Sequence, residues 1–338
     1  MTFPAAARKV FLLSGRNKKM GPTIGFIGAG VTGTALAVRL WQRGYPVVAV
    51  SSRSPGSAKR LASFVSDCKV CGSPQQVADL ASAVFITTPD DVISDIASGI
   101  RWHAGQVAIH CSGVHSIDIL EPASRSGAHV CCLHPLQTFA GLDEAMDNMA
   151  GSTFALEGDE AGLAVAHELA QALEGNIILL KAGDKVTYHI AAVALSNYLV
   201  ALMKTSADLW QSFGIPQEEA VKALLPLLKG TVRNIERVGI PGCLTGPIAR
   251  GDVETVRKHV TALGKGQSEK MDIYRVMGMK TLEIALAKGR ISLETAEEIR
   301  NLLNRPGRAP APYYGYVCDE FDMEYAAGYP SAPTDKSR

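Results

Sequence analysis

The sequence predicts an α/β Rossmann domain, built on a mostly parallel and doubly wound sheet, followed by an all-α domain. Three observations support this. Short apolar runs alternate with helical patterns up to about residue 182, and such alternation is typical of parallel sheets connected by helices. The patterns beyond residue 183 are helical only. The chain has 338 residues, which is long enough for two separate hydrophobic cores.

The strand and helix patterns follow one another in a regular order. Strand patterns cover 23–30, 46–54, 83–90, 106–113, 129–139, 152–159 and 176–181, and helical patterns cover 31–44, 57–65, 91–100 and 161–175. In the second domain, helical patterns cover 185–213, 217–237, 252–262, 267–288 and 292–303. We therefore expect an N-terminal extension at 1–19, a dinucleotide-binding domain at 20–182, a helical substrate and dimerisation domain at 183–305, and a flexible tail at 306–338.

Composition excludes several classes of protein. The formal net charge is +1, without the basic stripe of a nucleic-acid-binding protein. No uninterrupted apolar run reaches the roughly 18 residues needed to cross a bilayer, and VFLL near the N-terminus is too short for a secretory signal. The seven cysteines are scattered, which favours reduced thiols in the cytoplasm. Cys68 and Cys71 form a CxxC without a second ligand pair, so we expect no metal site.

A glycine motif ends the first strand pattern and opens the first helical pattern, which is the context that supports dinucleotide binding. Its residues are Gly28, Ala29, Gly30, Val31, Thr32 and Gly33. We expect Gly28 to allow a tight turn, Gly30 to let the backbone approach a pyrophosphate, and Gly33 to let helix pack closely on strand. The helix N-terminus would bind the phosphates. The alternative is a glycine turn that binds no nucleotide.

The end of the second strand pattern favours NADP(H) over NAD(H). NAD enzymes usually carry an acidic residue here that binds the ribose 2′-hydroxyl. This chain has Ser52 and Arg53 instead, followed by Lys59 and Arg60. A guanidinium binds phosphate oxygens in a forked geometry, so we expect Ser52 and Arg53 to bind a 2′-phosphate. The alternative is that Arg53 is only a solvated surface residue.

Two further strand ends should border the nicotinamide. Thr88 and Pro89 follow one strand pattern and Ser112 follows the next. Ligands of such sheets bind outside the carboxyl ends of the strands. We therefore expect these three residues to contact the cofactor. Thr88 and Ser112 could equally be capping or turn residues.

Four stretches together resemble a bacterial family of proteins assigned as oxidoreductases, in which a Rossmann-like domain precedes a helical domain of unknown function. They are IGFIGAGVTGTALAVRL, HPLQTFAG, YHIAAVALSNYLVAL and LTGPIARGD. The match covers about residues 22–303, and HPLQTF with GPIARGD is its most specific part. The family is similar in layout to 6-phosphogluconate and β-hydroxyacid dehydrogenases, ketopantoate reductases and pyrroline-5-carboxylate reductases. The resemblance implies NADP(H), a homodimer formed through the helical domains, and hydride transfer between the domains.

One departure concerns the first long helix of the second domain. β-Hydroxyacid dehydrogenases of this layout usually carry a catalytic Lys followed four residues later by Asn. Here Lys185 is followed at that spacing by His189, and Asn197 comes eight residues later. The Lys–Asn pair of those enzymes is therefore not reproduced.

The helix pattern KVTYHIAAVALSN carries polar residues on an apolar background. At about 100° per residue, Lys185, His189 and Ser196 fall on one side. Tyr188 flanks this stripe. A helix that is apolar nearly all round is expected to be buried, and its polar stripe needs partners or a wet cleft. We expect His189 to deliver a proton, Lys185 to polarise a carbonyl or bind a carboxylate, and Asn197 and Ser196 to orient these groups. The alternative is a structural His189 and a solvated Lys185.

Two loops supply the remaining candidates for substrate binding. In HPLQTF, His134 and Gln137 would form part of the cleft wall, or a turn held by side-chain hydrogen bonds. In LTGPIARGD, Arg250 would bind a substrate carboxylate, or would pair with Asp252 or Glu254 as scaffolding.

The sequence thus predicts a cytoplasmic, NADP(H)-dependent oxidoreductase that reduces a small carbonyl acid of the ketopantoate-like 2-oxo class. A carbonyl reductase needs a proton donor, a group that polarises the carbonyl and an anchor for the substrate charge. Two alternatives remain: an imine reductase of the pyrroline-carboxylate type, and a dinucleotide-binding protein without turnover. We expect a small-molecule substrate and a homodimer, without nucleic-acid or membrane partners.

Overall fold

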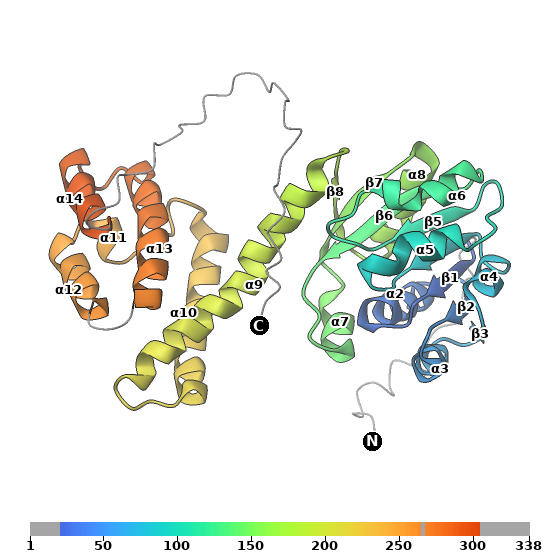
Figure 1. Ribbon diagram of the computed structural model, residues 1–338, viewed down its shortest axis with the longest axis horizontal. Coiled ribbons are helices and arrows are strands. Elements are labelled where there is room, and N and C mark those ends of the chain that lie inside the picture. The colour runs from blue at the N-terminus through green and yellow to red at the C-terminus, as the bar shows by residue number, and fades with distance from the viewer. Residues whose placement is uncertain (1–20, 265–267, 305–338) are drawn as a thin grey trace, which may run out of the picture. The chain divides into compact units, whose positions relative to one another are not determined.

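The computed structural model describes residues 21–264 and 268–304. The chain folds into two compact units, of which the first ends at Met203 and the second begins at Lys204. The expected N-terminal extension and tail, with Cys318, lie outside the described residues. Figure 1 shows the order of the elements along the chain. An α/β unit comes first and a helical unit follows, which confirms the predicted fold class.

The first unit is built on an eight-stranded sheet in the order β3-β2-β1-β4-β5-β6-β7-β8. The strands are β1 (Ile24–Ile27), β2 (Val47–Ser51), β3 (Lys69–Val70), β4 (Ala83–Ile86), β5 (Val107–His110), β6 (His129–Leu136), β7 (Thr153–Gly158) and β8 (Asn176–Leu179). Every neighbouring pair is parallel except β6 with β7, which is antiparallel. The carboxyl ends of β1, β4, β5 and β6 therefore lie at one edge of the sheet.

Helices cover both faces of this sheet (Figure 1). They are α2 (Val31–Gln42), α3 (Pro55–Phe64), α4 (Pro74–Ala78), α5 (Ile93–Ser98), α6 (Glu121–Arg125), α7 (Leu142–Asn148) and α8 (Glu160–Ala172), with short 3₁₀ turns η2 (Asp90–Val92) and η3 (Ile117–Leu120). Residues of α2, α3, α7 and α8 join one core cluster, and residues of α4, α5 and α6 join another. The doubly wound arrangement expected from the sequence is therefore present.

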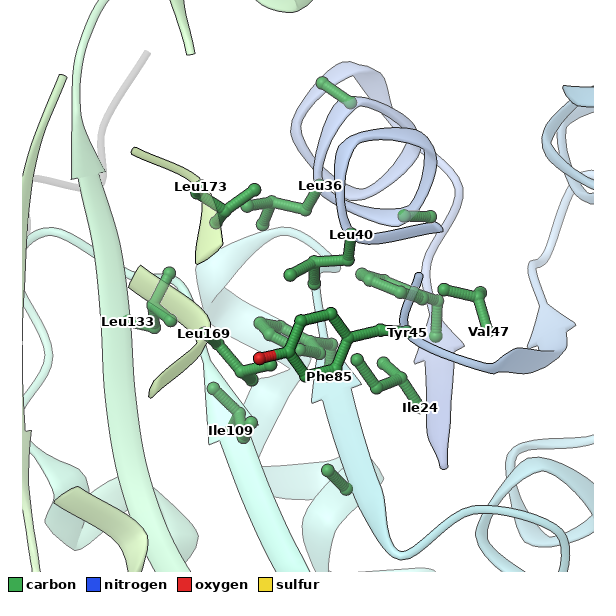
Figure 2. Packing of buried hydrophobic residues seen from close by; sticks show 14 of the residues in the cluster. Ile24, Leu36, Leu40, Tyr45, Val47, Phe85, Ile109, Leu133, Leu169 and Leu173 are labelled. Carbon is green, nitrogen blue, oxygen red and sulfur yellow. The ribbon is translucent and has the colours of Figure 1, made fainter. Parts of the chain in front are cut away.

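The larger core cluster packs aromatic and aliphatic side chains between sheet and helices. Figure 2 shows Tyr45 and Phe85 among leucines of α2 and α8. Phe85 also stacks on Phe26, with ring centroids 4.9 Å apart. Both rings are fully buried, and buried aromatic side chains contribute much of the apolar area that stabilises a core.

The two cysteines of the CxxC motif lie on opposite sides of the sheet. Cys68 packs against the cluster on the α2 and α3 side, whereas Cys71 belongs to the cluster on the α4 and α5 side. The residues between them form β3, and an extended chain separates such positions by about 10 Å, too far for a disulfide. All six cysteines among the described residues are free, and this part of the chain contains no cluster of metal ligands.

Within residues 184–264 and 268–304, six helices follow the sheet. They are α9 (Asp184–Gln211), α10 (Gln217–Val238), α11 (Pro247–Arg250), α12 (Val253–Leu263), α13 (Ser268–Ala287) and α14 (Leu293–Leu303). The last four enclose a third core cluster that includes Ile248, Val256, Leu282 and Ile299. Five of the six helices match the predicted patterns within two residues at each end, and the four-residue α11 was not predicted.

Helix α9 departs from the expectation that it is buried. Its apolar side chains Val186, Ile190, Leu195, Tyr198 and Val200 are all exposed, with 56–76% of each residue accessible. Among the described helices, α9 alone is long and apolar enough to cross a membrane. Core helices of soluble proteins also meet this criterion of length and composition, so it is weak evidence for a membrane span. The apolar surface that suggested burial is therefore present, but the described residues of the chain do not cover it.

Candidate functional site

The glycine loop after β1 has the geometry that a dinucleotide requires. Gly28 has φ +104°, and a Cβ on it would lie 2.7 Å from the Thr87 backbone. A Cβ on Gly33 would lie 2.3 Å from Thr87 Oγ1. By contrast, a Cβ on Gly30 would meet nothing within 4 Å, and no side chain caps the first turn of α2. Gly28 and Gly33 thus serve the fold, whereas Gly30 leaves space over an uncapped helix N-terminus, where an anion binds well.

Unpartnered polar groups lie at the neighbouring strand ends. The hydroxyls of Ser51, at the end of β2, and Thr88, just after β4, are buried without a hydrogen-bond partner among the described residues. Arg53, Lys59 and Arg60 are exposed and form no ion pair within the described part of the chain. Buried hydroxyls usually have a partner, so these groups fit a bound molecule with hydroxyl and phosphate groups. Pro89 precedes η2.

Ser112 organises the loop after β5. Its hydroxyl donates to Asp90 Oδ2 at 2.6 Å and accepts from the backbone N–H groups of Val114 and His115. The Ser112 hydroxyl therefore forms its hydrogen bonds within the loop, which favours the alternative that Ser112 is a turn residue. Through these bonds Ser112 fixes Gly113 at the carboxyl edge of the sheet, between β4 and β6.

His134 and Tyr188 form the central contact of the site. The Tyr188 hydroxyl lies 2.7 Å from His134 Nδ1, and the two rings meet edge to face. Burial, and then the charges of Lys185 and His189, lower the pKa of His134 to about 3. Burial raises the pKa of Tyr188 above its ordinary value of 10. Near neutral pH the pair is therefore a neutral imidazole and a protonated phenol.

His189 lies against the same loop from α9. A Cβ built on Gly113 would be 2.7 Å from His189 Nδ1 and 2.9 Å from His134 Nε2. Only glycine therefore fits at 113 without moving one of the imidazoles. His189 Nδ1 is buried and has no hydrogen-bond partner among the described residues. The two histidines thus converge on Gly113.

Lys185 points into the α/β unit and is only 2% exposed. Its ammonium donates to the Ser112 carbonyl at 2.6 Å and to Cys132 Sγ at 2.9 Å. No carboxylate lies within ion-pair distance of it in the described chain. The prediction that Lys185 and His189 share one side of the helix is confirmed, since both reach the 112–113 loop. However, Lys185 lies beneath this loop and holds it.

The other candidates on α9 lie farther along the helix. Ser196 and Asn197 are exposed. At 1.5 Å per residue, they follow His189 by about 10–12 Å along the axis. The structure therefore does not bring them to the His134–Tyr188 pair within the chain. A role for either residue stays a prediction.

Gln137 and Arg250 have partners that favour the structural alternatives weighed above. The Gln137 amide accepts from Thr138 N at 2.9 Å and donates to Ser152 Oγ at 3.4 Å. Arg250 is exposed, with a loose 3.9 Å contact to Asp252, whose carboxylate caps α12. Arg250 belongs to the second unit. Substrate binding by either residue stays a prediction.

Sequence reasoning missed the residues that complete the site. Tyr188 was noted only as flanking the polar stripe, although its hydroxyl lies 2.7 Å from His134 Nδ1. Gly113 and Asp90 were not singled out. The signal for Tyr188 was its spacing of three residues from Lys185, which places both on neighbouring sides of one helix. Gly113 carried no such signal, because its importance depends on two distant histidines.

Two family models match the chain. A Rossmann-like domain matches residues 14–135, and a domain of unknown function, DUF2520, matches residues 152–281. The class defined by fold and site is a Rossmann-type α/β protein with an appended helical domain. More specifically, the chain joins a Rossmann-like domain to a DUF2520 domain, which confirms the resemblance read from the sequence.

Solved structures with the same fold are known. An assigned NADP oxidoreductase, BF3122 of Bacteroides fragilis, is 22% identical with a TM-score of 0.63, over 78% of this chain and 98% of that one. Protein TM1727 of Thermotoga maritima is 27% identical with a TM-score of 0.63, over 79% and 100%. The reductive aminase of Aspergillus terreus, in complex with NADPH and ethyl-5-oxohexanoate, is 16% identical with a TM-score of 0.53, over 84% and 93%. No curated protein sequence matches this chain.

Proposed function

We propose that this protein is an NADP(H)-dependent oxidoreductase that reduces a small carbonyl acid of the 2-oxo class. The observation that carries the proposal is the pair of His134 and Tyr188, placed at the same sheet edge as the glycine loop. From β1 to β6 there are three strand spacings in the sheet order, or about 14 Å. A dinucleotide extended along this edge would bind its phosphates at one end and present its nicotinamide at the other.

The cofactor-binding residues fit NADP(H). Gly28 to Gly33 would hold the pyrophosphate, with Ser52 and Arg53 at the 2′-phosphate and with Thr88, Pro89 and Ser112 along the edge toward the nicotinamide. The open space at Gly30 and the unpartnered hydroxyl of Thr88 support this assignment. Two of the similar structures described above concern NADP or NADPH. When bound, the cofactor supplies a hydride to the carbonyl carbon of the substrate.

The protein would supply the proton. Reduction of a ketone to an alcohol needs one proton on oxygen. Tyr188 is the donor that we assign, because its phenol stays protonated near neutral pH and its oxygen lies against His134. His134 would stabilise the phenolate that forms by donating from Nδ1. General acid catalysis of this kind is worth about 10²–10⁴ in rate. His189, whose ring lies against the same loop as His134, would assist this proton transfer.

Charge in the site favours a carbonyl acid over an imine. The cation that perturbs His134 is the buried Lys185, and no carboxylate is among the groups that shift the pKa of His134. A positive potential attracts the carboxylate of an oxo acid and disfavours a protonated imine. In this proposal Lys185 contributes the positive potential of the site and holds the 112–113 loop through its bond to the Ser112 carbonyl. An imine reductase remains the second candidate, supported by the shared fold with the reductive aminase.

The assembly that we propose is a cytoplasmic homodimer formed through the helical domain. The support is the uncovered apolar surface of α9, which includes Leu195 and Val200, because exposed apolar patches of this kind usually mark an interface. Asn197 and Ser196 would then lie at or near that interface, and Arg250 could act from either copy. Sedimentation of the purified chain tests this: a monomer at micromolar concentration would refute it.

The first experiment is a fluorescence titration with NADPH and with NADH. We expect tighter binding of NADPH, and a loss of about tenfold in NADPH affinity, or ~1.4 kcal/mol, in Arg53→Ala. Arg101→Ala, which changes an exposed arginine outside the proposed site, is the matched control. Oxo acids and cyclic imines are then compared as substrates by NADPH oxidation. Absence of binding of both cofactors at millimolar concentration would refute the proposal and favour a protein without turnover.

A further inference from the structure

A side-chain hydrogen bond joins the loop after β5 to the turn after β4, from the Ser112 hydroxyl to Asp90 Oδ2 at 2.6 Å. We infer that Asp90 is a positioning residue. It fixes the orientation of the Ser112 hydroxyl, and through it the 112–115 loop that packs Gly113 against the two imidazoles. The structural part of this inference stands without the proposed function, whereas its effect on catalysis rests on that function.

The direction of each hydrogen bond at the Ser112 hydroxyl is fixed by its partners. The backbone N–H groups of Val114 and His115 can only donate, and their nitrogens lie 3.3 Å and 3.1 Å from Ser112 Oγ. A hydroxyl has two lone pairs and one hydrogen, so these two donors occupy both lone pairs. The hydrogen is therefore donated to Asp90, and a bond to a carboxylate is stronger than one between neutral groups.

The turn formed by residues 113–115 depends on this hydroxyl. Within the described chain, these residues form no backbone–backbone hydrogen bond, so the two bonds to Ser112 Oγ close the turn. The Ser112 backbone is held separately, because its N–H donates to His110 Nδ1 and its carbonyl accepts from Lys185. A change in the Ser112 side-chain rotamer would therefore release the turn while the Ser112 backbone stayed in place.

The Asp90 carboxylate is available for this role alone. Asp90 is partly buried in the first turn of η2, where no side chain caps the helix. In the described chain it forms no other hydrogen bond and no ion pair. Asp90 follows Thr88 by two residues at the end of β4, which pairs with β5 in parallel. Its carboxylate thus fixes the loop after one strand against the turn after its neighbour.

The position of the loop matters because Gly113 packs closely against the histidines. Gly113 is buried, and a Cβ on it would lie 2.7 Å from His189 Nδ1 and 2.9 Å from His134 Nε2. A displaced loop would therefore displace the rings or lose contact with them. Because His134 is bonded to Tyr188, the proposed proton donor would be displaced as well. Misplacement by about 1 Å can cost about a hundredfold in rate.

Two substitutions of Asp90 separate the hydrogen bond from the charge. Asp90→Asn keeps an oxygen that can accept from the Ser112 hydroxyl but removes the charge. Asp90→Ala removes both. Asp91→Ala changes the adjacent, exposed aspartate of the same turn and is the matched control.

The first test is amide hydrogen exchange in the full chain, followed by NMR at neutral pH. We expect the Val114 and His115 amides to be protected in the wild type, in Asp90→Asn and in Asp91→Ala, and to exchange at least about tenfold faster in Asp90→Ala. Unprotected amides in the wild type would overturn the inference without any variant. Unchanged protection in Asp90→Ala would overturn it as well, and so would an equal loss in Asp90→Asn, because the charge and not the bond would then be responsible.

Kinetics then tests the consequence for the proposed reaction. We expect kcat for NADPH oxidation to fall about ten- to a hundredfold in Asp90→Ala, with KM for NADPH little changed, and to recover largely in Asp90→Asn. A lower thermal stability of Asp90→Ala with unchanged kcat would show a purely structural bond and overturn the positioning role. If no substrate turns over in the wild type, the proposed function fails, yet hydrogen exchange still decides the role of Asp90 in the loop, so the two failures are distinguishable.

Discussion

Lys185 Nζ lies 2.9 Å from Cys132 Sγ in the interior of the α/β unit. Its other acceptor is the Ser112 carbonyl at 2.6 Å. An ammonium with two neutral or weakly polar acceptors loses hydration without the compensation of an ion pair. The stabilising effect of Lys185 therefore comes from its packed aliphatic chain and from the loop that it holds, and its charge acts on the site above.

This arrangement predicts that two substitutions of Lys185 differ in their effect on stability. We expect Lys185→Ala to lower the free energy of unfolding by about 2–4 kcal/mol, because it leaves a cavity in addition to the unpaired Ser112 carbonyl that both variants leave. Lys185→Met should stay within about 1 kcal/mol of the wild type, since it keeps the volume and removes the cost of burying a charge. Urea unfolding measures both. Equal destabilisation by the two would show that the ammonium bonds dominate.

The glycine loop predicts a separation of folding from binding. Gly33→Ala should destabilise the chain by about 1–3 kcal/mol through overpacking, because its Cβ would lie 2.3 Å from Thr87 Oγ1. Gly30→Ala should leave stability unchanged, since Gly30 has φ −72° and open space, but should weaken NADPH binding by at least about tenfold. Thermal unfolding with and without NADPH compares them. Normal NADPH binding by Gly30→Ala would contradict the phosphate site.

Tyr188→Phe should lower kcat by about 10²–10⁴ with a loss of only about 1 kcal/mol in stability from the missing hydrogen bond. Tyr274→Phe, which removes the same kind of edge-to-face tyrosine–histidine contact from the second unit, is the control.

Because burial raises the pKa of Tyr188, the donor should stay protonated up to about pH 10. The pH profile of kcat should therefore show no loss from phenol ionisation below that pH, and a decline near pH 8 that Tyr188→Phe abolishes would refute the assignment.

We expect the buried His110 to lower the free energy of unfolding in acid. Burial, and then the charges of Lys185, His115 and His134, lower its pKa from 6.5 to about 3 in the folded chain. Between these values the unfolded chain binds the proton and the folded chain does not, so stability falls as the pH falls from about 6.5 toward 3.

The variant His110→Asn isolates this effect. It keeps an acceptor for the Ser112 N–H, which His110 Nδ1 binds at 3.2 Å, but it does not titrate. Urea midpoints at about pH 7.5 and about pH 5 should therefore differ less in His110→Asn than in the wild type. His167→Asn, at an exposed histidine of α8, is the control and should retain the wild-type difference. Equal pH dependence in all three chains would exclude His110 as the origin.

Much of the fold could be predicted because its longer elements are amphipathic or apolar throughout. The buried strand β4, for example, reads as an uninterrupted apolar run. The elements that were missed, such as β3 and α4, have two and five residues, too few for a periodic pattern. The antiparallel direction of β7 could not be read either, because alternation is the same in both directions.

The site could be predicted only in part, for a related reason. Periodicity correctly placed Lys185 and His189 on one side of α9, yet it could not show that Lys185 lies beneath the loop. The contact of His134 with Tyr188 joins residues 54 positions apart, and no local spacing encodes it. The prediction that α9 is buried was wrong. Hydropathy indicates that an apolar surface should be buried, but it does not indicate which part of the chain, or which other molecule, buries it.

The placement of Cys68 and Cys71 on opposite sides of the sheet has a practical consequence. Each thiol is shielded by a different layer of helices, so their rates of alkylation would follow the opening of each layer separately. A single pulse of a thiol reagent, read by mass spectrometry, would show which layer loosens first in dilute urea. Addition of NADPH would then reveal whether a ligand tightens one layer or both.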